Sequence, residues 1–199
     1  MAAQKKDVLI LVLIATFSGL LLSGTYILTK KDIAKAKIEK QKKALKAVMP
    51  FLGNNPYEKI VYKYQENTIN IFTVTENENF LGAALELKTK KGYSGWIVFY
   101  LGVDADGKVT GMYITESKET PGLGDKAKDK KWWGQFVGKS KEDFIFKVEK
   151  DKGDVVSITA STITSRAITN ASDQGLDLYK DFLANGAKTN VVEAQDGKK

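Results

Sequence analysis

An unbroken apolar run lies close to the N-terminus. Residues 8–28 read VLILVLIATFSGLLLSGTYIL and carry no formal charge. A helix rises about 1.5 Å per residue, so a helix of this length spans about 30 Å, which matches the hydrocarbon core of a bilayer. The run is longer than the apolar core of a signal peptide, and no A-x-A-like cleavage site follows it. The pattern therefore predicts a short stub and a retained transmembrane helix over residues 1–29.

The next segment is rich in lysine and in residues that favour helix. Residues 31–48 read KDIAKAKIEKQKKALKAV, with scattered apolar positions among the charges. Pro50 and the stretch GNNP at 53–56 end this pattern. We expect a basic juxtamembrane helix over 30–50 that continues the membrane span.

From residue 57 onward the apolar period is mostly two, which predicts strands. Four segments fit strands, and 80–87 fits either a strand or a short helix; the four are 60–64, 68–74, 96–103 and 109–115. The sequence Asp-Ala-Asp-Gly at 104–107 predicts a hairpin between the last two. After an irregular stretch over 116–131, further strands are predicted at 144–148 and 155–158.

A helix over 164–183 closes the pattern, because its apolar residues recur on one face. Strands dominate and helices are segregated, so the fold class is α+β with an antiparallel or mixed sheet. We expect one soluble domain over 51–185 and a polar C-terminal tail over 186–199.

The composition excludes several kinds of chemistry. The 199 residues contain no cysteine and no histidine. Disulfides, iron–sulfur clusters, Cys/His zinc sites, cysteine nucleophiles and histidine bases are therefore ruled out. If the protein carries electrons, it needs an organic cofactor.

The charge distribution argues for a lipid surface. The formal net charge is +7, and residues 1–46 hold all of it, with ten lysines against three acidic residues. The other 153 residues are balanced, with 21 basic and 21 acidic groups. Because the excess flanks the apolar run, we expect contact with lipid headgroups and no nucleic-acid partner.

Three stretches are candidates for function. Residues 159–165 read TASTITS, with five hydroxyls between a predicted strand and a predicted helix. Such a cluster caps a helix, and a helix N-terminus also receives phosphate. Residues 119–125 read ETPGLGD, which predicts a rigid loop that either turns at the surface or approaches a flat ligand. The aromatics of GYSGW at 92–96 and of WW at 132–133 either stack on a ring or pack in the core.

The order of these motifs resembles a known family. An N-terminal anchor, GYSGWI, ETPGLGD, WWGQF and TASTITS follow one another as in the RnfG subunits of Rnf ion-translocating electron-transport complexes. The soluble part is similar to the FMN-binding domain of the NqrC subunit of the sodium-pumping NADH:quinone reductase. The resemblance covers nearly the whole chain and implies an electron-carrying subunit without independent catalysis.

The resemblance also implies the cofactor and its attachment. In the family the last motif usually reads SGATxTS, and its first threonine bears FMN as a phosphoester; the matching residue here is Thr162. This chain departs from the pattern at Thr159, Ala160 and Ser161, and Val156 replaces a common aspartate. Ser161 is therefore a rival acceptor.

Further site residues follow from the same resemblance. The flavin is expected to contact the ETPGLGD loop and an aromatic side chain; these residues are Glu119, Thr120, Leu123, Gly124, Gly95 and either Trp96 or Trp132. The phosphate and ribityl end is expected to contact Ser161, Ile163, Thr164 and Ser165. We expect no catalytic acid or base and no metal.

Partners and topology complete the expectations. The resemblance implies the other subunits of an Rnf-type complex, a flavin transferase and the lipid bilayer as partners, with the large domain on the periplasmic or extracellular side. The eight lysines that follow the apolar run oppose this orientation, but long domains cross regardless of nearby charge. Two alternatives remain: an anchored module that binds a phosphate-bearing ligand reversibly, and a structural subunit without flavin.

Overall fold

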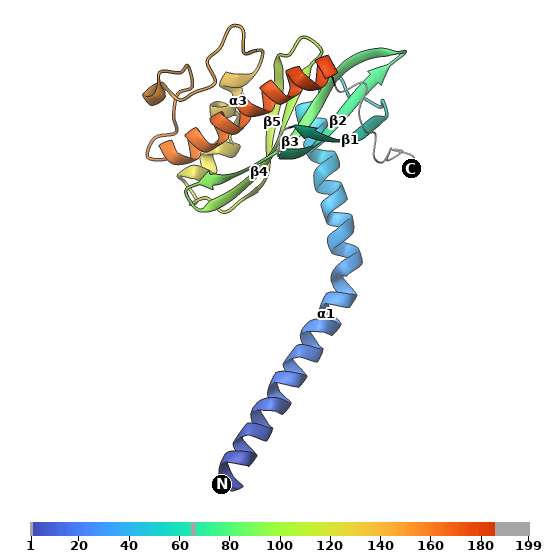
Figure 1. Cartoon of the computed structure of the whole chain (residues 1–199), viewed down its shortest axis with the longest axis vertical. Coiled ribbons are helices and arrows are strands. Elements are labelled where there is room, and N and C mark those ends of the chain that lie inside the picture. The colour runs from blue at the N-terminus through green and yellow to red at the C-terminus, as the bar shows by residue number, and fades with distance from the viewer. Residues whose placement is uncertain (1, 65–66, 186–199) are drawn as a thin grey trace. The chain divides into compact units, whose positions relative to one another are not determined.

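The computed structural model describes residues 2–64 and 67–185, and the predicted tail at 186–199 lies outside them. Figure 1 shows a long N-terminal helix, an antiparallel sheet and a C-terminal helix laid across the sheet. The main elements are α1 (Ala2–Val48), β1 (Tyr57–Tyr64), β2 (Asn67–Glu76), β3 (Asn79–Gly92), β4 (Gly95–Asp104), β5 (Val109–Ser117) and α3 (Thr162–Asn185). Between β5 and α3 lie four short helices: η1 (Gly124–Lys128), α2 (Lys130–Trp133), η2 (Gly134–Phe136) and η3 (Glu149–Asp151).

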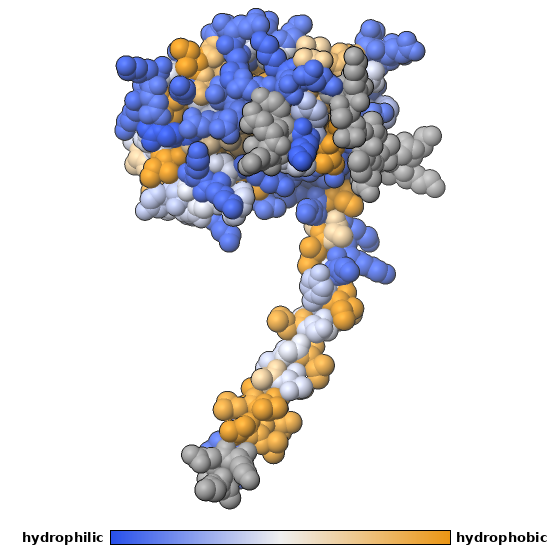
Figure 2. Space-filling model, in the orientation of Figure 1, coloured by the Kyte–Doolittle hydropathy of each residue, from blue (hydrophilic) through white to orange (hydrophobic). Residues whose placement is uncertain are grey.

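The chain divides into two compact units, residues 1–41 and residues 42–199. The first is the greater part of α1, whose large apolar side chains between Val8 and Leu28 are exposed. Figure 2 shows this apolar surface along the helix. Among the described residues, α1 is the one helix long and apolar enough to cross a membrane by length and composition. The predicted helices at 8–28 and 31–48 are therefore one continuous helix.

The sheet of the second unit is a simple meander. Its strand order is β1-β2-β3-β4-β5, and all four neighbouring pairs are antiparallel. The α+β class with an antiparallel sheet is confirmed, and the open choice at 80–87 is settled as part of strand β3. The predicted hairpin turn is also present, with the Gly107 amide donating to the Asp104 carbonyl at 3.1 Å.

Alternating residues of the sheet build two cores, one on each face. On one face Leu85, Phe99 and Leu101 join a cluster with Ile168 and Tyr179 of α3. The opposite face buries a smaller cluster that includes the last turns of α1; its members are Ala44, Leu45, Val48, Met49, Leu52, Phe72, Val74, Ala84 and Tyr100. The compact unit therefore begins inside the segment that the sequence marked as a juxtamembrane helix.

Two predicted strands are wrong. Residues 144–148 and 155–158 form no strand, and they meet only in an isolated parallel bridge between Val148 and Val155. Their apolar residues are still buried, with Phe146 and Val155 among the core. An irregular segment that covers a core also buries every second side chain, so the period of two does not by itself distinguish it from a paired strand.

Candidate functional site

A pocket of about 600 Å³ opens at the N-terminal end of α3. We call it the Thr162 pocket. Its lining comes from the β3–β4 turn, the loop after β5 and the start of α3; the residues are Tyr93, Glu119, Thr120, Leu123, Gly124, Ala160, Ser161, Thr162, Ile163 and Thr164. It therefore gathers three of the stretches that the sequence singled out.

Hydroxyl groups fix the start of α3. The buried Ser165 hydroxyl donates to the Ser161 carbonyl at 3.0 Å and accepts from the Ile158 amide at 2.9 Å. The Ser165 amide also donates to the Ser161 carbonyl, at 3.0 Å, so the helix begins at Thr162. The amides of the first turn have no partner within the helix. They give this end of the pocket a partial positive charge.

Glu119 joins the three segments of the pocket. Its buried carboxyl group accepts from the Thr164 hydroxyl at 2.6 Å and from the Ser94 amide at 3.0 Å. Two glycines make room for it. A Cβ on Gly124 would lie 2.5 Å from one carboxyl oxygen, and a Cβ on Gly92 would lie 2.7 Å from the other. The carboxyl group thus holds the loop and the β3–β4 turn against the helix.

Ala160 stands at the rim in a conformation unusual for its type. Its φ is +60°, in the left-handed region, which costs L-residues about 1–2 kcal/mol. This is the position where the family motif has glycine, so the backbone there keeps the shape that glycine would adopt freely.

Cationic side chains lie beside Thr162. The Lys150 ammonium donates to the Thr162 hydroxyl at 3.4 Å. One turn further along α3, Arg166 donates to the two carboxyl oxygens of Asp151 at 2.5 and 2.8 Å. These hydrogen bonds hold the pKa of the Asp151 carboxyl below its usual value.

Most of the predicted site residues meet in this pocket. Eight of them line it: Ser161, Thr162, Ile163, Thr164, Glu119, Thr120, Leu123 and Gly124. Ser165 is buried within the first turn of α3, and Gly95 begins β4 next to the β3–β4 turn.

The two predicted tryptophans lie elsewhere. Trp132 is buried against Phe136, with ring centroids 5.5 Å apart, and its indole N–H donates to the Val156 carbonyl at 2.8 Å. Trp96 is 51% exposed, with the Lys90 ammonium 4.7 Å from its ring centroid. The aromatic residue that lines the Thr162 pocket is Tyr93, in the same GYSGW stretch. Tyr93 and Ala160 are the lining residues that sequence reasoning missed.

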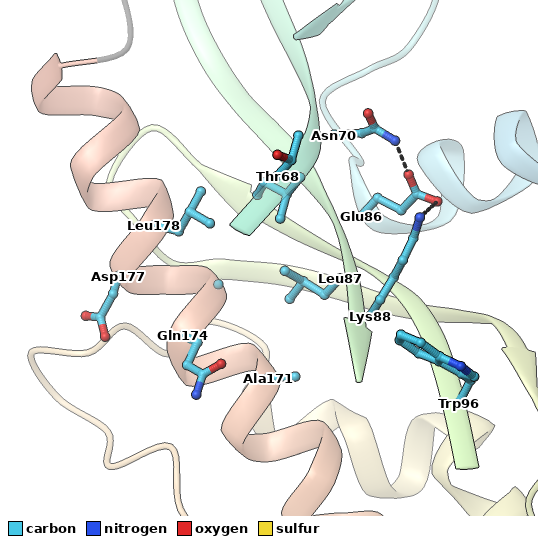
Figure 3. Close-up of a pocket in the computed structure, with 12 residues that line it drawn as sticks. Thr68, Asn70, Glu86, Leu87, Lys88, Trp96, Ala171, Gln174, Asp177 and Leu178 are labelled. Carbon is cyan, nitrogen blue, oxygen red and sulfur yellow. Dashed lines mark hydrogen bonds and ion pairs between the residues drawn. The ribbon is translucent and has the colours of Figure 1, made fainter. Parts of the chain in front are cut away.

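A second pocket of about 570 Å³ includes Trp96 in its lining, and we call it the Trp96 pocket. It opens where the pairing of β2 with β3 ends at Asn70 and Glu86. Figure 3 shows side chains from the middle of α3 facing residues of β2, β3 and β4 across it. Its polar groups already pair with one another: Asn70 donates to Glu86, and Lys88 lies 3.7 Å from the other oxygen of that carboxyl group.

Comparisons with known proteins agree with this geometry. The family model of the FMN-binding domain matches residues 92–177, which include the whole lining of the Thr162 pocket, and the model of the RnfG N-terminal region matches residues 2–48. The chain is 33% identical over 196 residues to the RnfG subunit of the ion-translocating oxidoreductase complex of Aliivibrio fischeri strain MJ11, covering 90% of this chain and 92% of that protein.

Two more distant similarities were found. The chain is 32% identical over 121 residues to the RnfG counterpart in the Na⁺-translocating ferredoxin:NAD⁺ oxidoreductase complex of Acetobacterium woodii, covering 59% of this chain and 58% of that protein. Among solved structures, NqrC of Shewanella oneidensis is 21% identical with a TM-score of 0.48, covering 71% of this chain and 74% of that one.

Proposed function

This chain belongs to the RnfG family of ion-translocating oxidoreductase complex subunits, and we propose that it is a membrane-anchored electron-transfer subunit that carries FMN linked through its phosphate to Thr162. One observation carries the proposal. The Thr162 side chain lines a pocket at the first residue of α3, inside the segment that matches the FMN-binding domain. A hydroxyl group at a helix N-terminus is well placed to hold a phosphoester.

The pocket residues fit the proposed group. A volume of about 600 Å³ lies within the range of about 300–1,000 Å³ that is usual for cofactor pockets. Tyr93, Leu123 and Ile163 offer exposed apolar surface to a flat ring. The first-turn amides and the Thr162 hydroxyl lie at the other chemical extreme and suit the phosphate. The amphipathic lining thus matches a molecule with an apolar ring and an anionic end.

Attachment requires an activated flavin nucleotide and a transferase. The bond from Thr162 Oγ1 to phosphorus forms as the hydroxyl loses its proton. The bond from that phosphorus to its leaving group breaks, and with a flavin dinucleotide as donor the group that leaves is a nucleoside monophosphate. FMN then remains as a phosphodiester whose ring is free for electron transfer. Ser161 is 7% exposed and Thr164 1%, so Thr162, which is less buried than either, is the favoured acceptor.

The chain's own residues bind and position; they supply no catalytic acid or base. FMN supplies the redox chemistry, since it accepts and passes on electrons. Glu119 fixes the pocket by its bonds to Thr164 and Ser94. The apolar rim limits the access of water to the ring.

The proposal also covers location and partners. The apolar surface of α1 anchors the chain in the cytoplasmic membrane, with the large domain on the periplasmic or extracellular side. The partners are the other subunits of an ion-translocating oxidoreductase complex. A covalent link suits this location, because it prevents the loss of cofactor to a compartment where free FMN is scarce.

Intact mass of the full chain, co-expressed with a flavin transferase, tests the proposal. We expect the parent to gain one FMN-ester mass that denaturation does not remove, and the Thr162→Ala variant to gain nothing. Ser161→Ala serves as the matched control and should behave as the parent. A gain that survives in Thr162→Ala would move the acceptor to a neighbouring hydroxyl. A flavin lost on denaturation would establish a reversible binder, and a colourless parent would establish a structural subunit.

A further inference from the structure

Lys150 is the basic side chain that contacts the proposed acceptor. Its ammonium lies 3.4 Å from the Thr162 hydroxyl oxygen, although the two residues are far from adjacent in the chain. The chain is rich in lysine, so one contact at the surface needs further support. That support comes from the loop that carries Lys150.

The loop 145–155 is rigidly built. The Val155 amide donates to the Lys147 carbonyl, and the Glu149 amide donates to the Val155 carbonyl, each at 3.0 Å. Its base is anchored because Phe146, Val148 and Val155 are all buried. Gly153 packs so closely that an added Cβ would lie 2.0 Å from the Lys147 carbonyl oxygen. Lys150 therefore projects from a fixed tip, within η3.

A second bond locks this tip onto α3. Asp151, the neighbour of Lys150, accepts two hydrogen bonds from Arg166, which lies one turn beyond Thr162 on the same helix. The Arg166 charge is thereby engaged with a carboxylate. The Lys150 ammonium is directed instead to the Thr162 hydroxyl. The loop and the helix thus form a frame with one cation aimed at the acceptor.

We propose that Lys150 positions the flavin phosphate at Thr162 and pairs with the resulting phosphodiester, an inference that rests on the function proposed above. A phosphorus bonded to Thr162 Oγ1 brings its free oxygens within reach of the same ammonium group. The helix N-terminus and a cation together favour an anion more than either does alone. Lys150 acts before attachment by attracting the incoming phosphate, and afterwards by neutralising the diester.

The rate of flavin attachment to the full chain tests this role. We would follow the flavinylated fraction by intact mass in the parent and in Lys150→Met, Lys150→Arg and Lys147→Met. Because the side chain is exposed, we expect Lys150→Met to slow attachment about fivefold and Lys150→Arg to restore most of the rate. Lys147→Met removes the same charge from the same loop and should attach flavin at the parent rate. The thermal midpoints of all four should agree.

A second readout reports on the diester itself. In the loaded proteins, the ³¹P resonance of the phosphodiester should shift in Lys150→Met and stay in place in Lys147→Met. Attachment at the parent rate together with an unshifted resonance in Lys150→Met would overturn the role of Lys150. Equal slowing by both methionine variants would also overturn it, because the effect would then belong to net charge. A parent that gains no flavin would instead defeat the proposed function, and this inference with it.

Discussion

The Thr162 pocket and the Trp96 pocket have similar volumes, about 600 and about 570 Å³, and α3 contributes residues to both. They differ in the part of the helix that they meet. The Thr162 pocket meets the first turn, where amides lack partners within the helix. The Trp96 pocket meets the middle turns, where the backbone is already hydrogen-bonded along the helix.

Their polar side chains differ in the same way. In the Trp96 pocket, Asn70, Glu86 and Lys88 bond to one another, and Asp177 pairs with Lys141 at 2.7 Å. In the Thr162 pocket, the Thr162 hydroxyl and the first-turn amides face the cavity. Two cavities of equal size therefore differ in how much polar capacity they leave for a ligand, and that capacity marks the functional one.

The largest effect is expected from Gly124→Ala, which fills space in the Thr162 pocket. The added Cβ would lie 2.5 Å from a Glu119 carboxyl oxygen and 2.7 Å from the Thr164 hydroxyl oxygen. We expect the bond between these side chains to break, lowering the free energy of unfolding by about 2–3 kcal/mol. Chemical denaturation measures the loss, and intact mass should show reduced flavin attachment.

Gly175→Ala is the matched change in the Trp96 pocket. Its Cβ would lie 2.7 Å from a methyl carbon of Leu87, the far end of a side chain. That clash is offset by the gain in helix propensity, about 1 kcal/mol, so we expect a net change under about 1 kcal/mol and normal flavin attachment. If both variants lose flavin equally, the distinction between the pockets fails.

A smaller effect is expected from Thr164→Val, which removes a hydroxyl group and keeps the shape. The Glu119 carboxyl oxygen would lose the donor now at 2.6 Å, at a cost of about 1–2 kcal/mol. Further along α3, Thr169 is fully buried, and among the described residues its hydroxyl oxygen has no hydrogen-bond partner. Thr169→Val should therefore be neutral or stabilising. Thermal unfolding of the two variants should move in different directions; a comparable loss in both would remove the special status of the Thr164–Glu119 bond.

The smallest effect is expected from Ala160→Gly at the rim of the Thr162 pocket. Relief of the left-handed strain at φ +60° gains about 1 kcal/mol, while the freer unfolded chain costs about 0.4–1 kcal/mol. We expect a net gain of up to about 0.5 kcal/mol in unfolding free energy, measured by denaturant titration, with flavin attachment unchanged. A clear destabilisation would show that Ala160 contributes a contact.

The sequence predicted best what local chemistry decides. The apolar run, the Asp-Ala-Asp-Gly turn and the hydroxyl-rich start of α3 each depend on neighbours in the chain, and each is helix or turn as expected. The resemblance to the RnfG family is confirmed by the family models and the relatives. Specific motifs in a fixed order carried it.

Predictions that depend on distant neighbours fared less well. The apolar alternation at 144–148 and 155–158 marks burial correctly but says nothing of a strand partner. The choice between Tyr93 and Trp96 depends on which side of the β3–β4 turn each side chain leaves. Trp132 has the composition of a ring-stacking residue, yet Phe136 and the Val156 carbonyl hold it in the core. Local sequence does not encode these contacts.

The way α1 ends has a practical consequence for anyone who wants the domain free of detergent. The Val48 carbonyl accepts from the Thr110 hydroxyl at 2.5 Å, and Gly102 lies against the same carbonyl with no room for a Cβ. A truncated protein that starts at residue 51 would strip the helix from this face and leave Phe72 and Val74 bare to water. A soluble version for spectroscopy or crystallisation should instead start shortly before Lys42, keeping the last helical turns and discarding the apolar run.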